Sequence, residues 1–284
     1  FKDVPGWTTA VMLVGMLSAF LAGMMALFAT DLKRVLAYST VSQLGYMVYA
    51  VGAGGIFASQ MHLMSHSVFK ALLFLAAGAV IHAVGTRDMR LMGGLGKKMP
   101  FNKVVFILGA LALAGVPIMN GFWSKELILE AGMESGNLWA YGVMVFTAGL
   151  TALYTFRCVW MVFFGQPRSE LHAHDAGKAM KVSLSILAVG SLTTWLLAGP
   201  FSQVLHETLP LHHLHSESLV EMVTKVWTSK ATFLALAVIA LAVGISGRLY
   251  QLSVDRSVLL QDQARRQHER RVEVWGRRGA IVDR

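Results

Sequence analysis

Cysteine and charge are what this sequence has least of. Cys158 is the single cysteine among 284 residues, so the chain has neither an internal disulfide nor a cysteine cluster for iron–sulfur or structural zinc. Charged residues make up 14% and hydrophobic residues 55%, whereas about 25% of an average soluble domain is charged. No flavin, haem or nucleotide motif is visible, so we expect no cofactor. The composition is typical of a membrane protein and excludes an ordinary soluble enzyme.

Charge is missing altogether from long stretches, the first of which runs from Trp7 to Thr30. At a rise of about 1.5 Å per residue, such a run crosses a bilayer as one helix. Similar runs recur, and they predict an all-α, polytopic transmembrane helix bundle with about seven spans. The expected spans are residues 7–30, 33–53, 56–84, 102–124, 138–164, 180–199 and 229–249.

The fourth expected span is interrupted by Gly115-Val116-Pro117. Proline removes a backbone donor and clashes with the preceding turn, so we expect a broken helix. Broken helices inside membranes are tolerated where the freed backbone lines a wet or protein-buried cavity. The polar residues Asn120, Ser124, Lys125 and Glu126 follow directly after the break.

The net charge of +9 comes from basic residues in loops and in the tail. An excess of lysine and arginine in loops is the usual mark of the cytoplasmic side, so we expect no nucleic-acid partner. The basic loop residues that fall on one side of the predicted topology are Lys33, Arg34, Arg87, Arg90, Lys97, Lys98, Lys103, Arg168, Lys178 and Lys181. The opposite loops are rich in glutamate. This topology places the tail after Tyr250 in the cytoplasm.

The sharpest functional signal lies inside the third span. His62, His66 and Lys70 are four residues apart, so they form one stripe on a helix. Ionisable residues inside a membrane normally face the bundle interior and mark an ion or proton path. Histidine titrates near neutrality and burial makes a lysine easier to deprotonate, which favours a proton relay. Two alternatives are interhelical hydrogen bonding and a zinc site, although no glutamate follows the first histidine and no third ligand stands out.

Lys125 and Glu126 have two interpretations. They are either an interfacial pair at the end of a span or a second protonation site beside the helix break. Arg157, inside the fifth span, needs a partner or a lipid phosphate, and a topological anchor is its expected role.

Several stretches together resemble the proton-pumping antiporter-like subunits of respiratory complex I and the related multi-subunit sodium/proton antiporters. The matching stretches are Asp31-Leu32-Lys33-Arg34-Val35-Leu36-Ala37-Tyr38-Ser39-Thr40-Val41-Ser42-Gln43-Leu44-Gly45-Tyr46, His62 to Phe74, Met92-Gly93-Gly94-Leu95, Ala114-Gly115-Val116-Pro117, Gly121-Phe122-Trp123-Ser124-Lys125-Glu126, Tyr154-Thr155-Phe156-Arg157 and Phe163-Phe164-Gly165-Gln166-Pro167-Arg168. They cover residues 7–170, and the distal complex I subunit is the most similar.

Subunits of that family hold two inverted five-helix repeats. The resemblance implies that residues 1–170 are the second repeat, with Lys70 as the channel lysine and His62 and His66 as relay histidines. It implies that Lys125 with Glu126 forms the terminal protonation site. The chain departs from the family at Ile118-Met119-Asn120, where Pro-Phe-Ser is common.

The remainder of the chain divides into two parts. Residues 171–250 are expected to hold two additional transmembrane helices with a His-rich loop, and residues 251–284 form a basic polar tail. The end of the tail, Arg277-Arg278-Gly279-Ala280-Ile281-Val282-Asp283-Arg284, resembles the segment after the membrane anchor of class B penicillin-binding proteins. A surface helix and a fusion remnant are both open interpretations of this tail.

We therefore expect proton translocation by a multi-pass subunit of the inner (plasma) membrane within a complex I-like NADH:quinone oxidoreductase. The subunit would have no redox centre of its own, would work with other membrane subunits and would meet quinone only through them. A subunit of a cation/proton antiporter is one alternative. A structural membrane scaffold, or a fusion with a penicillin-binding-protein anchor, is another. Because Phe1 is not an initiator, we expect a piece of a longer protein.

Overall fold

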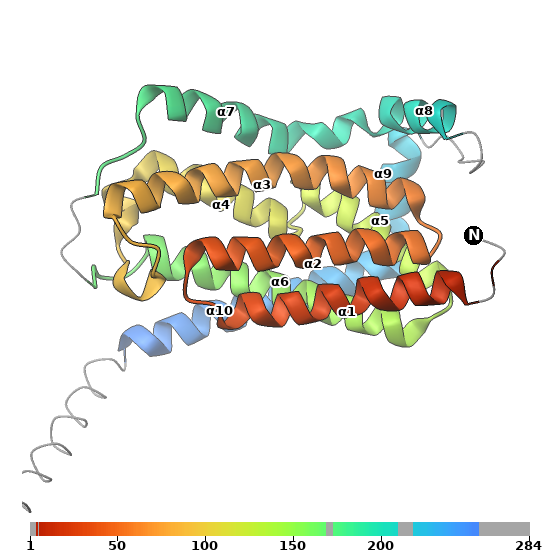
Figure 1. The fold of residues 1–284 in the computed structure, drawn as a ribbon, viewed down its shortest axis with the longest axis horizontal. Helices are drawn as coiled ribbons and strands as arrows, with labels where there is room; N and C mark the ends of the chain where they lie inside the picture. Colours follow the sequence, from red (N-terminus) through yellow and green to blue (C-terminus); the bar gives the residue numbers. More distant parts are fainter. Residues whose placement is uncertain (1–3, 5, 169–172, 210–217, 256–284) are drawn as a thin grey trace, which may run out of the picture.

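The computed structural model describes residues 4, 6–168, 173–209 and 218–255, and these residues form a bundle of antiparallel helices (Figure 1). The α-helices are α1 (Trp7–Phe28), α2 (Leu32–Gly52), α3 (Ile56–Val84), α4 (Pro100–Ala114), α5 (Asn120–Glu134), α6 (Leu138–Phe163), α7 (Lys178–Thr193), α8 (Ala198–Thr208), α9 (Leu219–Thr228) and α10 (Lys230–Asp255). Short 3₁₀ turns cover Met89–Leu91, Leu95–Lys97 and Thr194–Leu197. Within the described ranges there is no strand, only an isolated bridge between Asp31 and Asp88. The predicted all-α polytopic bundle is confirmed.

The predicted helix break is present between α4 and α5. The fourth predicted span was nevertheless too short, because α5 continues to Glu134 and does not end near residue 124. One interpretation of the sequence placed Lys125 and Glu126 at the end of a span. Both lie inside α5 and are buried against other helices.

The helical segment predicted as the sixth span is also longer than expected. α7, a 3₁₀ turn and α8 run from Lys178 to Thr208. His206 therefore lies in α8 and not in the predicted His-rich loop, whose other histidines, His212, His213 and His215, lie outside the described residues.

The predicted count of seven spans stays a prediction. Five helical segments are long and apolar enough to cross a membrane: Trp7–Phe28, Ile56–Val84, Leu138–Phe163, Lys178–Thr208 and Lys230–Leu252. α4 is apolar but only 15 residues long, and α5 carries Lys125 and Glu126.

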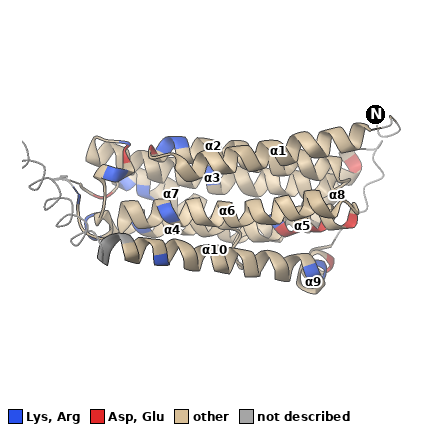
Figure 2. Ribbon diagram, turned by 90° about the horizontal axis from the view of Figure 1, so that it is seen from below, with Lys and Arg blue, Asp and Glu red and all other residues tan. Residues whose placement is uncertain are grey.

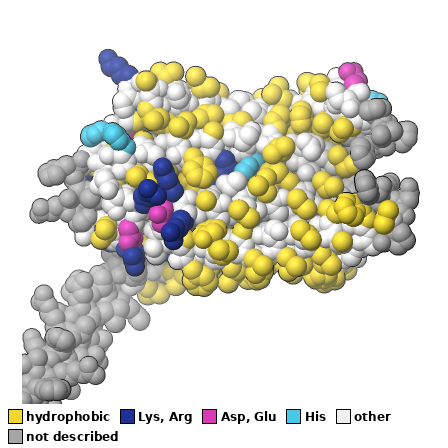
Figure 3. Space-filling model, viewed as in Figure 1, with side chains coloured by type: hydrophobic (Ala, Val, Ile, Leu, Met, Phe, Trp, Pro, Cys, Tyr) yellow, Lys and Arg dark blue, Asp and Glu magenta, His cyan; other side chains and the backbone are white. Residues whose placement is uncertain are grey.

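The charged side chains separate along the bundle. Lysine and arginine gather at the end that holds the start of α2 and the segment between α3 and α4, whereas acidic residues lie mainly at the other end (Figure 2). This pattern fits the predicted basic side of the topology. Between the two ends the surface is largely apolar (Figure 3). Large exposed apolar residues on this surface include Leu17 and Leu21 of α1, Ile186 of α7 and Leu241 of α10.

α1 and α2 pack so closely that their backbones touch. A Cβ on Gly45 would lie 2.7 Å from the carbonyl oxygen of Gly15 and 2.8 Å from Cα of Ala19. Membrane helices associate through such small residues because lipid provides no hydrophobic force to hold them together. This contact fixes α2, whose other face holds the polar residues of the interior.

Candidate functional site

The stripe on α3 faces the interior of the bundle. His62 is fully buried, and His66 and Lys70 are only 6% and 5% exposed. The ring centroids of His62 and His66 are 6.0 Å apart, as expected for residues about one helical turn apart. The polar side of α3 therefore lies against protein and not against lipid.

Lys70 is held by α2. Its Nζ donates to the carbonyl oxygen of Leu36 at 3.0 Å and to the hydroxyl of Ser39. In the described part of the chain it forms no ion pair with a carboxylate. A buried ammonium without a counter-ion is costly, so this position requires a reason beyond packing.

His62 joins three helices. Its Nδ1 is 2.8 Å from the hydroxyl of Ser124 in α5, and its Nε2 is 3.1 Å from Oε1 of Gln43 in α2. Because an amide oxygen only accepts, Nε2 carries a proton, and a neutral ring then accepts at Nδ1 from Ser124. The Ser124 hydroxyl has a second acceptor, the carbonyl oxygen of Asn120 at 3.2 Å. When the ring gains a proton, Nδ1 can donate to Ser124 while Ser124 donates to Asn120, so both protonation states of His62 are accommodated.

The helix break leaves a backbone carbonyl free, and Lys125 binds it. Gly115 adopts a left-handed conformation with φ of 81°, and Val116 N–H bonds back to the Leu111 carbonyl, which closes α4 in a Schellman motif. In a continuous helix the Leu113 carbonyl would accept from residue 117, but Pro117 has no N–H. Lys125 Nζ instead donates to this carbonyl oxygen at 2.8 Å.

Lys125 also lies over the ring of Tyr46, with Nζ 5.6 Å from the ring centroid. This cation–π contact and the Leu113 carbonyl hold a fully buried ammonium between α2 and the end of α4. The break thus creates a polar pocket for Lys125 in the middle of the bundle.

Glu126 points away from Lys125. Successive side chains on a helix project about 100° apart, and the two residues form no ion pair. Glu126 is 1% exposed and interacts with the hydroxyl of Thr232 in α10, but neither carboxylate oxygen has a hydrogen-bond partner of good geometry among the described residues. The predicted pair is therefore two separate buried groups, one facing α2 and α4 and one facing α10.

Residues 1–151, more than half of the chain, match the family described as NADH:quinone oxidoreductase/Mrp antiporter, transmembrane. The chain belongs to this family. It is 44% identical over 225 residues to F(420)H(2) dehydrogenase subunit L of Methanosarcina mazei, with 73% of this chain and 34% of the relative covered. It is 46% identical over 233 residues to NAD(P)H-quinone oxidoreductase chain 5 of Picosynechococcus sp., with 71% and 35% covered.

A solved structure of an Mrp complex from Dietzia sp. superimposes on 98% of this chain and 32% of its own chain, with a TM-score of 0.69 and 26% identity. The chain spans about a third of the length of these relatives. Membership in the NADH:quinone oxidoreductase/Mrp antiporter family agrees with the resemblance that the motifs around Lys70 and Lys125 indicated.

The structure brings all five predicted site residues of this family member into the interior: His62, His66, Lys70, Lys125 and Glu126. It also shows two partners outside the predicted set, Ser39 for Lys70 and Gln43 for His62. Their signal was present in the sequence, because Ser39 and Gln43 are four residues apart and so lie on one face of a helix. Among the described residues, no three histidines, cysteines or acids are grouped to hold a metal ion.

Several buried polar atoms around the site have no hydrogen-bond partner within the described chain. They are Gln43 Nε2, Ser65 Oγ, His66 Nε2, Asn120 Oδ1 and Tyr154 OH. Buried polar groups are almost always satisfied by protein or by ordered water. The interior between Lys70 and Lys125 therefore offers binding positions for bridging water molecules.

Proposed function

We propose that this chain carries protons across a membrane, with residues 1–170 as one translocating repeat of a larger assembly. The observation that supports this most directly is the row of buried protonatable side chains that runs from Lys70 through His66 and His62 toward Lys125 and Glu126. Intramembrane ionisable residues facing a bundle interior are typical of proton paths.

In this proposal Lys70 stores the proton. Among the described residues the ammonium donates to Leu36 and Ser39 and lies 5.9 Å from the ring centroid of Phe74, but no carboxylate pairs with it. Its protonated form therefore depends strongly on nearby charge. Coulomb interactions are strong in the low-dielectric interior, and a new charge beside Lys70 would drive its proton onward.

His66 and His62 pass the proton along α3, and Ser124 lets His62 change its protonation state without losing a partner. Lys125 and Glu126 then exchange the proton with water on one side. Because these two side chains point in different directions, we assign them successive steps: Lys125 faces the relay and Glu126 faces α10.

The assembly we propose is complex I-like, in the inner (plasma) membrane, with the basic end and the tail in the cytoplasm. The names of the relatives support this, since they are subunits of NAD(P)H-quinone oxidoreductase and F(420)H(2) dehydrogenase. The chain would meet electrons and quinone only through partner subunits, so it needs no redox centre of its own.

A cation/proton antiporter subunit is the second candidate. The Mrp complex from Dietzia sp., which superimposes on nearly the whole chain, favours it. Membrane vesicles distinguish the two: a redox complex acidifies or alkalinises the lumen on electron input, whereas an antiporter does so on an imposed sodium gradient.

The test is Lys70→Ala in vesicles that carry the assembled complex, with assembly measured by gel and proton movement by a pH-sensitive dye. We expect assembly to persist and proton translocation to be lost. Lys33→Ala, on the exposed start of α2, is the matched control and should translocate normally. Normal coupling in Lys70→Ala would refute the relay, and loss of assembly would instead favour a structural scaffold.

A further inference from the structure

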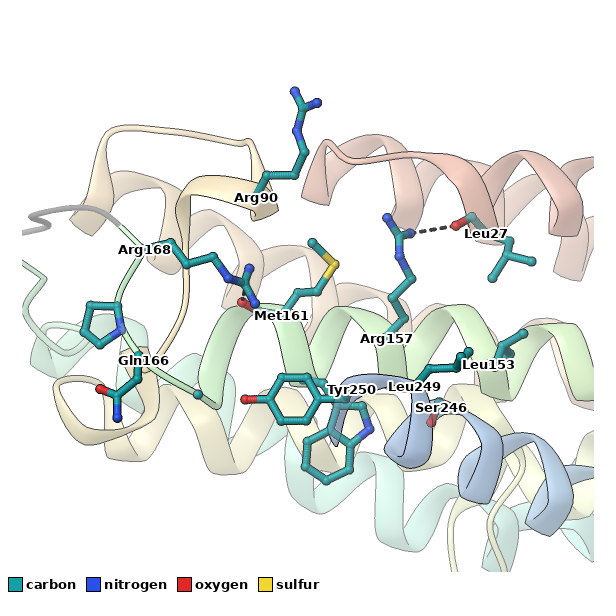
Figure 4. A pocket seen from close by; sticks show the side chains of 13 residues that line it. Leu27, Arg90, Leu153, Arg157, Met161, Gln166, Arg168, Ser246, Leu249 and Tyr250 are labelled. Atoms are coloured by element: carbon teal, nitrogen blue, oxygen red, sulfur yellow. Dashed lines mark hydrogen bonds between the residues drawn. The ribbon is translucent and has the colours of Figure 1, made fainter. Parts of the chain in front are cut away.

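A cavity of about 940 Å³ lies at the basic end of the bundle, between α1, α6 and α10 (Figure 4). The cavity is separate from the proposed proton relay, because its lining includes none of the five relay residues His62, His66, Lys70, Lys125 and Glu126. Its volume is in the range of about 300–1,000 Å³ that is typical of ligand-binding cavities. The chemistry of its wall identifies what it would hold.

Two arginines supply positive charge to the cavity. Arg157 Nη1 donates to the carbonyl oxygens of Leu27 and Ala29 at 2.7 and 2.9 Å, just beyond the end of α1. Arg168 Nη1 donates to the carbonyls of Met89 and Met161 at 3.1 and 3.4 Å. Neither arginine forms an ion pair with a carboxylate in the part of the chain that the structure describes. Carbonyl contacts position both guanidinium groups but leave their charge uncompensated.

The third arginine of the wall contributes no net charge. Arg90 is paired with Asp88 at 2.7 Å, and its guanidinium holds the pKa of the Asp88 carboxyl below its usual value through a hydrogen bond. In Figure 4 it extends away from Arg157 and Leu249. The positive charge of the cavity therefore comes from Arg157 and Arg168.

The remaining wall is apolar and aromatic. Leu27, Leu153 and Leu249 line it, and Leu249 is 57% exposed, so the apolar wall continues onto the outer face of α10. The rings of Trp160 and Tyr250 stack with centroids 5.5 Å apart. Tryptophan and tyrosine are enriched at the level where headgroups meet acyl chains.

We propose that this cavity binds one anionic membrane phospholipid. The phosphate lies between Arg157 and Arg168, and the first part of an acyl chain follows Leu153 and Leu249 toward the membrane. Basic pockets between transmembrane helices on the cytoplasmic side recognise anionic headgroups by this combination of charge and apolar surface. The lipid would join α1, α6 and α10, which meet at this end.

The experiment is native mass spectrometry of the full chain in mild detergent, titrated with dioleoyl phosphatidylglycerol, dioleoyl phosphatidylcholine or inorganic phosphate. We expect one tightly bound phosphatidylglycerol, preferred over phosphatidylcholine by about fivefold or more. Each basic side chain near an anionic lipid contributes a factor of about five. Arg168→Gln should therefore weaken phosphatidylglycerol binding about fivefold, and the double variant Arg157→Gln/Arg168→Gln about 25-fold.

Arg248→Gln is the matched control, because Arg248 is an exposed arginine of α10 that does not line the cavity. It should leave binding unchanged. Leu249→Trp fills the apolar side of the cavity and should weaken lipid binding. It keeps Arg157 and Arg168, and with them the hydrogen bonds of Arg157 to the end of α1.

Equal binding of the two lipids would overturn the proposal, as would an equal loss in Arg248→Gln, which would indicate general surface charge. Full displacement of phosphatidylglycerol by inorganic phosphate, with no effect of Leu249→Trp, would show a free-anion site instead.

Discussion

Replacing Lys125 by methionine separates a proton-transfer role from a structural one. Lys125 Nζ is the partner of the Leu113 carbonyl at 2.8 Å, a carbonyl that Pro117 leaves without its helical donor. Methionine keeps the length and apolar stem of the side chain but neither donates nor carries charge.

The expected effect on stability is small because two contributions oppose each other. Leaving the Leu113 carbonyl unsatisfied costs about 1–3 kcal/mol. Removing a fully buried ammonium relieves a desolvation penalty of several kcal/mol. We therefore expect the melting temperature of the purified chain to stay within a few degrees of wild type, or to rise.

The expected effect on translocation is large. A positioned proton-transfer group contributes about 10²–10⁴-fold to a rate, so proton movement in Lys125→Met vesicles should fall at least about a hundredfold. Lys125→Gln, which can donate to Leu113 but cannot carry a proton, should be equally inactive. Lys103→Met is the control: this partly buried lysine of α4 lies 4.5 Å from the ring centroid of Phe164 and should translocate normally.

Normal translocation in Lys125→Met would refute the reasoning and reduce Lys125 to a donor that closes the helix break. Recovery of translocation in Lys125→Gln alone would lead to the same conclusion, because only the hydrogen bond would then matter.

Two further predictions concern α2. Gln43→Leu removes the 3.1 Å partner of His62 Nε2, which costs about 1–3 kcal/mol. We expect translocation to slow about 5- to 150-fold in the vesicle assay, and an unchanged rate would exclude Gln43 from the relay. Gly45→Ala places a Cβ 2.7 Å from the Gly15 carbonyl and should destabilise the chain by about 1–3 kcal/mol. The control is Gly78→Ala in α3, whose Cβ meets nothing within 4 Å and which should instead stabilise the chain by up to about 1 kcal/mol. Thermal unfolding measures both variants, and equal shifts in melting temperature would contradict the close contact between α1 and α2.

The sequence by itself determined which segments are apolar, where the broken helix lies and that His62, His66 and Lys70 share one helix face. These features depend on local chemistry. Pro117 lacks an N–H wherever it stands, and a four-residue spacing places His62, His66 and Lys70 on one face of any helix. The family motifs follow from the same residues, and the match over residues 1–151 agrees with them.

Only the tertiary structure decided what each of these groups contacts. The sequence does not show that Gln43 and Ser124, 81 residues apart in the chain, meet on opposite nitrogens of His62. It also does not show that Lys125 and Glu126, although neighbours in sequence, face different helices. Hydrogen bonds between helices depend on how the helices rotate and cross, and the close contact of Gly15 with Gly45 sets this for α1 and α2. The cavity beside Arg157 has the same origin, since α1, α6 and α10 enclose it only after they pack.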